Sequence, residues 1–76
     1  MKVSAPQLRA ARALLDWTQS ELSERSLVHR NAIVAMERGE AVAVDAKERV
    51  VEALKAAGIV FETDNGFARV SLPTAE

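Results

Sequence analysis

Apolar residues recur at helical spacing in four stretches of the chain, and three of these stretches open with a clear start signal. In the first, Leu8, Ala11 and Leu15 follow at i, i+3 and i+7 and form one apolar face. Ser4 and Gln7 just before it have the spacing of a capping box. The pattern predicts a helix that begins after Ser4 and ends near Leu15.

The second stretch repeats this arrangement over a shorter distance. Thr18 and Glu21 form another capping box, and Trp17 with Leu22 occupies the positions of a hydrophobic staple. We expect a short helix that ends near Ser26, with Trp17 in the core.

A third helix is expected to begin at His29 or Arg30. Val28 and Ile33 again have staple spacing, and Gly39 stands where a helix commonly ends in a left-handed residue. In the fourth stretch Asp45 is the expected N-cap, with Val50 and Leu54 facing inward.

After Gly58 the period changes from helical to alternating. The runs "IVFE" and "FARVSL" are separated by residues 63–66, which contain Asn-Gly, a strong signal for a β-hairpin. Pro73 is expected to end the second strand. The fold predicted is mainly α, a compact four-helix domain over residues 1–58 with a C-terminal β-hairpin over 59–72 and a flexible tail over 73–76.

Composition narrows the function classes. The chain has 76 residues, enough for one small core, and is 49% hydrophobic and 28% charged. It has no cysteine and one histidine, so we expect neither a metal site nor a cofactor. No run is long enough for a membrane span and no signal peptide is recognisable, which favours the cytoplasm. Because no catalytic set or phosphate loop is present, we expect no enzyme activity.

Charge is distributed unevenly although the net value is only −1. Residues 1–38 carry six basic and four acidic side chains, whereas residues 39–76 carry four basic and seven acidic ones. The basic groups therefore favour the half with the second and third helices, although a mixed solvated surface explains this mild asymmetry almost as well.

Two short helices about three residues apart, the second ending in glycine, form a helix-turn-helix pattern. The spacing would hold the third helix with His29, Arg30 and Asn31 directed away from the core. Arginine can bridge guanine O6 and N7, and asparagine can bridge adenine N6 and N7. The helix starts at Thr18 and His29 would offer N–H groups to phosphates.

The stretch "LRAARALLDWTQSELSERSLVHRNAIVAMERGE", followed by "ALKAAG", resembles the Xre/Cro-type helix-turn-helix family of phage repressors and small bacterial regulators. The most specific parts are "WTQ-x-x-L" and "I-x-x-x-ERG". The resemblance covers about two thirds of the chain. It implies a compact helical DNA-binding domain that works as a dimer on a palindromic operator.

The resemblance also implies roles for single residues. Arg30 and Asn31 match base-reading positions, with His29 beside them, and Ala35 matches a position that could contact a thymine methyl group. Gln19 matches a phosphate contact, and we place Thr18 and Arg38 with it. Arg12 and Glu37 match an internal salt bridge between the first and third helices.

The chain departs from the family pattern in the turn. Leu27 occupies the place of the usual glycine, and His29 that of a small N-cap. A left-handed leucine costs about 1–2 kcal/mol. Either Leu27 is strained and held by packing, or the turn has another shape.

The hairpin needs a surface that covers its apolar residues, since two strands alone are marginally stable. These residues could pack on the helices. Alternatively, an edge strand pairs with its twin across a two-fold axis. The expected dimerisation residues are Ile59, Phe61, Phe67 and Val70.

These observations favour a sequence-specific DNA-binding transcriptional regulator. It would be a repressor-like homodimer on the nucleoid that reads the major groove of double-stranded DNA with the helix at 30–38. The alternatives are a protein-interaction module, or an antitoxin-like protein that binds both DNA and a protein partner.

Overall fold

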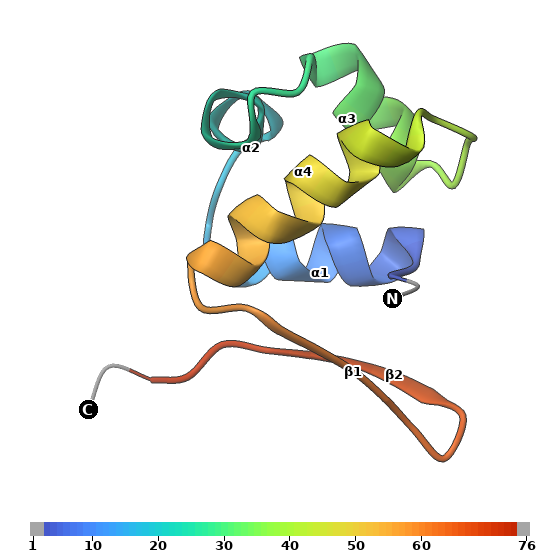
Figure 1. Ribbon diagram of the computed structural model, residues 1–76. Helices are drawn as coiled ribbons and strands as arrows, with labels where there is room; N and C mark the ends of the chain where they lie inside the picture. The colour runs from blue at the N-terminus through green and yellow to red at the C-terminus, as the bar shows by residue number, and fades with distance from the viewer. Residues whose placement is uncertain (1–2, 75–76) are drawn as a thin grey trace.

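The computed structural model describes residues 3–74. Four helices are followed by an antiparallel hairpin, so the predicted fold class is confirmed (Figure 1). The elements are α1 (Ala5–Leu14), α2 (Gln19–Ser26), α3 (Arg30–Glu37), α4 (Val44–Ala56), β1 (Val60–Asp64) and β2 (Phe67–Ser71).

Both predicted capping boxes are present. The Ser4 hydroxyl accepts from the Gln7 N–H, and the Gln7 side chain accepts from the Ser4 N–H at 2.9 Å. Thr18 and Glu21 make the same reciprocal pair at the start of α2. These bonds satisfy N–H groups that a helix start leaves without partners, and they set where both helices begin.

The prediction that Asp45 caps the fourth helix is wrong. The N-cap is Ala43, two residues earlier, so the helix begins at Val44, and Ala43 makes no side-chain cap bond. Asp45 instead lies in the first turn, where a negative charge is favoured by the helix dipole.

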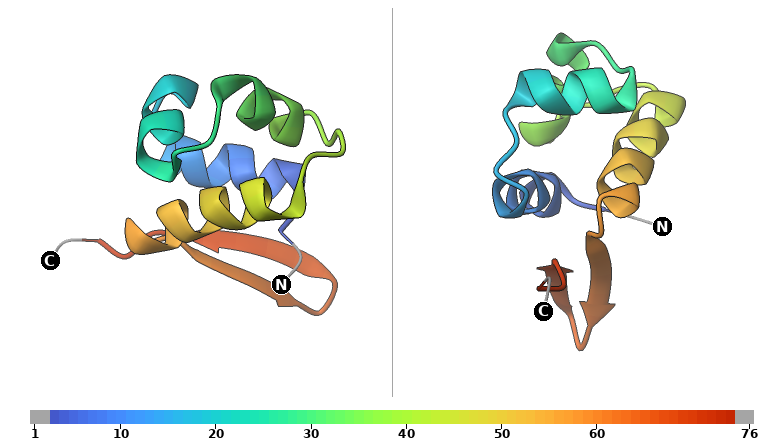
Figure 2. Two further views of the ribbon diagram at one scale, coloured as in Figure 1. Left: turned by 45° about the horizontal axis from the view of Figure 1, so that its top comes forward. Right: turned by 90° about the vertical axis from the view of Figure 1, so that its left-hand side faces the viewer.

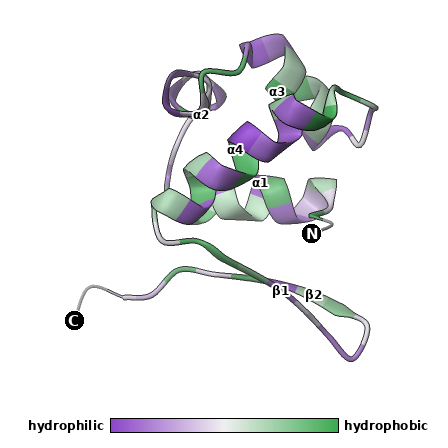
Figure 3. Cartoon of the chain, viewed as in Figure 1, coloured by the Kyte–Doolittle hydropathy of each residue, from purple (hydrophilic) through white to green (hydrophobic). Residues whose placement is uncertain are grey.

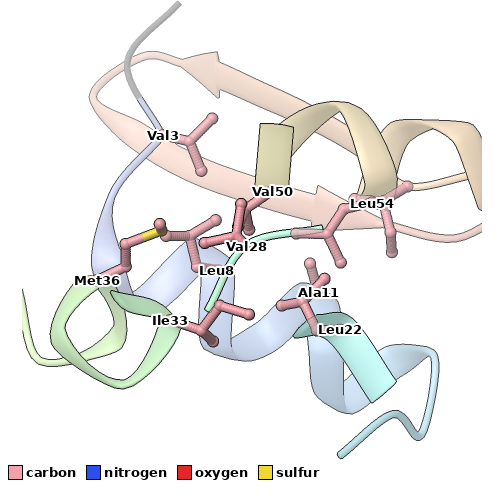
Figure 4. Close-up of a cluster of buried hydrophobic side chains, with 10 residues drawn as sticks. Val3, Leu8, Ala11, Leu22, Val28, Ile33, Met36, Val50 and Leu54 are labelled. Atoms are coloured by element: carbon pink, nitrogen blue, oxygen red, sulfur yellow. The ribbon is translucent and has the colours of Figure 1, made fainter. Parts of the chain in front are cut away.

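One core joins all four helices (Figure 4). Most of its members come from the expected inner faces, and the staple residues Leu22, Val28 and Ile33 are all buried. Trp17 is half-buried against this core, and the Arg25 guanidinium lies 4.3 Å from the centre of its ring. The buried apolar residues are Val3, Leu8, Ala11, Leu22, Val28, Ile33, Met36, Val50, Leu54 and Ile59.

The hairpin forms a layer on the side of the helices opposite α2 and α3 (Figures 1 and 2). Its register pairs Asp64 with Phe67 across Asn65 and Gly66. Both turn residues have positive φ, 51° and 80°, as a two-residue type I′ turn requires. Because the turn needs only these two residues, β1 runs to Asp64 and is longer than the expected run of residues 59–62.

The side chain of Gln7 hydrogen-bonds α1 to the hairpin. Gln7 is buried, and its Nε2 donates to the carbonyl of Arg69 at 3.2 Å and to that of Glu62 at 3.5 Å. Leu72 packs beneath Gly58, after which Pro73 and Thr74 leave regular structure. Of the expected tail, the last two residues lie outside the described range.

Candidate nucleic-acid interface

The turn between α2 and α3 keeps a left-handed residue at the family's glycine position. Leu27 has φ 59° and ψ 33°, and its side chain is 83% exposed. Its own packing therefore does not hold it. The Leu27 N–H donates to the Ser23 carbonyl at 2.9 Å, and the Ser23 hydroxyl donates to the Val28 carbonyl at 2.6 Å. These bonds and the buried Val28 fix the turn.

The start of α3 is organised by His29. Its Nδ1 accepts from the Asn31 N–H at 3.1 Å, which makes histidine the N-cap. The side chains of His29, Arg30 and Asn31 are exposed, and α3 begins with hydrophilic residues (Figure 3). Ile33 and Met36 are buried on the opposite face.

This arrangement leaves several hydrogen-bonding groups free on a rigid support. Within residues 3–74 the side chains of Arg30 and Asn31 take part in no hydrogen bond or ion pair. A helix that carries an arginine and an asparagine at its exposed end has the shape and the donors for base edges in a groove about 12 Å wide.

At the other end of α3 lies a polar cluster centred on Glu37, whose side chain is only 6% exposed. Arg12 Nε lies 2.8 Å from Oε2, and Gln19 Nε2 lies 3.1 Å from Oε1. Arg12 also donates to the Trp17 carbonyl at 2.9 Å, and Arg9 donates to the Glu37 carbonyl. The structure thus brings Arg12 and Glu37 together, and it ties α1, α2 and α3 at one point.

The other expected contact residues differ in accessibility. Thr18 and Arg38 are exposed, whereas Gln19 and Ala35 are half-buried. The N–H of Thr18 donates to the Glu21 side chain. The N–H groups at the start of α2 that lack an intrahelical partner therefore belong to residues after Thr18. The Gln19 amide nitrogen donates to Glu37 Oε1, so this donor is used within the protein.

The four expected dimerisation residues do not form one patch. Ile59 is part of the core, and Phe61 and Val70 are half-buried against it, so the helices cover most of their surface. Phe67 is 68% exposed, and Val60 on the same strand face is 42% exposed. Sequence reasoning did not single out Val60, because its exposure depends on which hairpin face meets the helices.

Sequence reasoning also missed the second role of Gln7. The capping box explains this residue fully at the level of sequence, and no local signal links it to Arg69, 62 positions away.

Residues 40–43, which follow α3, contain Glu40 and no basic side chain.

Within residues 3–74 no group of three His, Asp or Glu side chains is placed to hold a metal ion. None of the helices in this range has the length and hydropathy to cross a bilayer.

A scan against protein-family models matches residues 8–55 to a family described as helix-turn-helix. A search of curated proteins finds no significant match. The matched residues include α2, the turn at Leu27 and α3, and they make up more than half of the chain. The chain therefore belongs to the Xre/Cro-type helix-turn-helix family of DNA-binding proteins.

Proposed function

We propose that this protein is a sequence-specific transcriptional regulator, a repressor-like homodimer without enzyme activity that works on the nucleoid in the cytoplasm. The observation that carries the proposal is the exposed start of α3. His29, Arg30 and Asn31 stand there without internal partners for their outer groups, on a helix whose other face is fully buried.

Arg30 and Asn31 are the proposed base-reading residues, with His29 beside them. A good bidentate contact contributes about 1–3 kcal/mol of discrimination between bases. Ala35, one turn later, offers only a methyl group and suits contact with thymine. Thr18, Gln19 and Arg38 are the proposed phosphate contacts, which would set the orientation of the protein on the duplex.

A homodimer would read a palindromic operator with half-sites about one DNA turn, roughly 34 Å, apart. A single short helix contacts few base pairs, and pairing two copies doubles the sequence that is read.

The test is selection of bound sites from random double-stranded DNA, followed by titration of the selected site. Arg30→Ala and Asn31→Ala should each weaken binding by about 5- to 150-fold and relax base choice at one position. Lys55→Ala, an exposed change in the last turn of α4, is the matched control and should bind as the parent does. Failure to enrich any site would refute the proposal.

The alternative is a protein-interaction module or an antitoxin-like protein. It is favoured by the exposed apolar side chains of Leu27 and Phe67 and by the acidic residue after α3. Titration of DNA at two salt concentrations separates the classes, since phosphate contacts make affinity fall steeply with salt. An affinity that is weak and indifferent to salt would favour the alternative.

A further inference from the structure

The hairpin packs one face against the helices and leaves its outer face exposed (Figure 2). We infer that the free edge of β1 pairs antiparallel with β1 of a second copy around Phe61, to make a four-stranded sheet with both helical bodies on one face. This inference rests on the proposed function for its use on DNA, although the pairing itself can be measured without DNA.

The first argument is geometric. α3 and the hairpin lie at opposite ends of the molecule, with α1 and α4 between them (Figure 1). Antiparallel pairing of two identical edges has its two-fold axis perpendicular to the sheet. The helices of both copies therefore lie on the same side of the sheet, and both α3 helices lie on the same face of the dimer. Stacking two hairpins face to face would turn one copy over and point the helices in opposite directions. Only the edge-paired dimer suits two half-sites on one side of a straight duplex.

The outer face of the hairpin is also poorly suited to burial. Glu62, Asp64 and Arg69 share it with Val60 and Phe67. Arg69 Nη2 lies 3.6 Å from Asp64 Oδ2, and both side chains are more than half exposed. Face-to-face stacking would remove these charges from water, which is costly.

The backbone of β1 is free to pair. In a two-residue hairpin the two residues that flank the turn, here Asp64 and Phe67, hydrogen-bond to each other. Along an antiparallel ladder such pairs alternate with pairs whose N–H and C=O groups point away from the partner strand, toward the free edges. On β1 those residues are Phe61 and Thr63. Natural edges are commonly protected by proline or lysine, and β1 has neither. β2, in contrast, lies against α1 and is followed closely by Pro73.

Charge selects one register. If Thr63 paired with its twin, Glu62 would face Asp64 of the second copy, and if Phe61 paired with Thr63, Glu62 would face its own twin. Like charges directly opposite are destabilising. With Phe61 opposite its twin, Glu62 faces Val60, and the half-buried Phe61 rings meet on the helical side of the sheet.

The experiment measures self-association by sedimentation equilibrium in the absence of DNA. Thr63→Pro removes an outward N–H from the proposed edge and should yield a monomer. Ala68→Pro is the matched control, because Ala68 is the cross-strand partner of Thr63 and its N–H faces the opposite edge. It should leave the dimer intact. The inference is overturned if the parent protein is a monomer, if Thr63→Pro remains a dimer, or if Ala68→Pro becomes a monomer.

A second pair of variants tests the register without touching the backbone. Val60→Lys would place a cation opposite Glu62 of the second copy and should tighten the dimer by roughly 2- to 10-fold, whereas Val60→Glu should loosen it by a similar factor. Shifts of the same sign for both would refute pairing around Phe61. A stable dimer that enriches no DNA site would refute the proposed DNA-binding function and leave this inference standing. A monomer that still enriches a DNA site would refute this inference, and the homodimer with it, and leave sequence-specific DNA binding standing.

Discussion

Arg12 and Glu37 join α1 to α3 through two hydrogen bonds, with Nε 2.8 Å from Oε2 and Nη2 3.1 Å from Oε1. The carboxylate also accepts from Gln19 and is almost fully buried. The orientation of the proposed reading helix therefore depends on one acidic side chain that three helices share.

Glu37→Ala should lower the free energy of unfolding by about 2–4 kcal/mol, because it leaves the Arg12 guanidinium partly buried without its partner. Urea denaturation measures this. The control is Glu52→Ala, which removes an exposed acid 3.9 Å from Lys55 and should change stability by less than about 0.5 kcal/mol. Equal effects of the two changes would mean that the buried pair has no special role.

Leu27→Gly should stabilise the protein by about 1 kcal/mol. Glycine removes the left-handed strain of about 1–2 kcal/mol, and its greater freedom in the unfolded chain offsets part of the gain. Leu27→Ala keeps the strain and loses only an exposed side chain, so its stability should stay within about 0.5 kcal/mol of the parent. Thermal unfolding of both variants distinguishes strain from contact, and destabilisation by glycine would show that the leucine side chain matters in the folded protein.

Gln7→Ala should loosen the hairpin. The change removes both donated bonds to the carbonyls of Glu62 and Arg69, at a cost of about 1–3 kcal/mol. Amide hydrogen exchange in β1 and β2 should speed up. Ser4→Ala disrupts the same capping box and leaves the hairpin bonds in place, so exchange in the strands should stay slow. Unchanged strand exchange in Gln7→Ala would argue that apolar packing alone holds the hairpin.

Glu40→Lys should strengthen DNA binding on selected and random sites alike. Glu40 is exposed directly after Gly39, where an acidic group close to phosphates would oppose binding. The slope of log affinity against log salt should steepen by about 1 per protomer. Glu52→Lys makes the same charge change on α4, away from the end of α3, and serves as the control. If both variants gain equally, the effect belongs to net charge and says nothing about the position of the DNA.

The elements that local spacing can specify were predictable from the chain. Both capping boxes span four residues, and the Asn65–Gly66 turn needs only two, so these signals do not depend on how the helices pack. The helix-turn-helix pattern likewise lies within one short stretch, which is why the exposed start of α3 could be anticipated. The Arg12–Glu37 pair was expected from family resemblance, since 25 residues separate its members.

Tertiary packing decided the rest, because it depends on residues distant in sequence. Leu27 keeps the left-handed turn although its side chain contacts little, since Ser23 and the buried Val28 hold the backbone there. The fourth helix begins at Val44, ahead of the side chain with the better capping chemistry. Ile59 belongs to the core, and Gln7 reaches strands more than fifty residues away. Local chemistry placed the turns and most helix starts, and the three-dimensional arrangement determined which faces stay exposed.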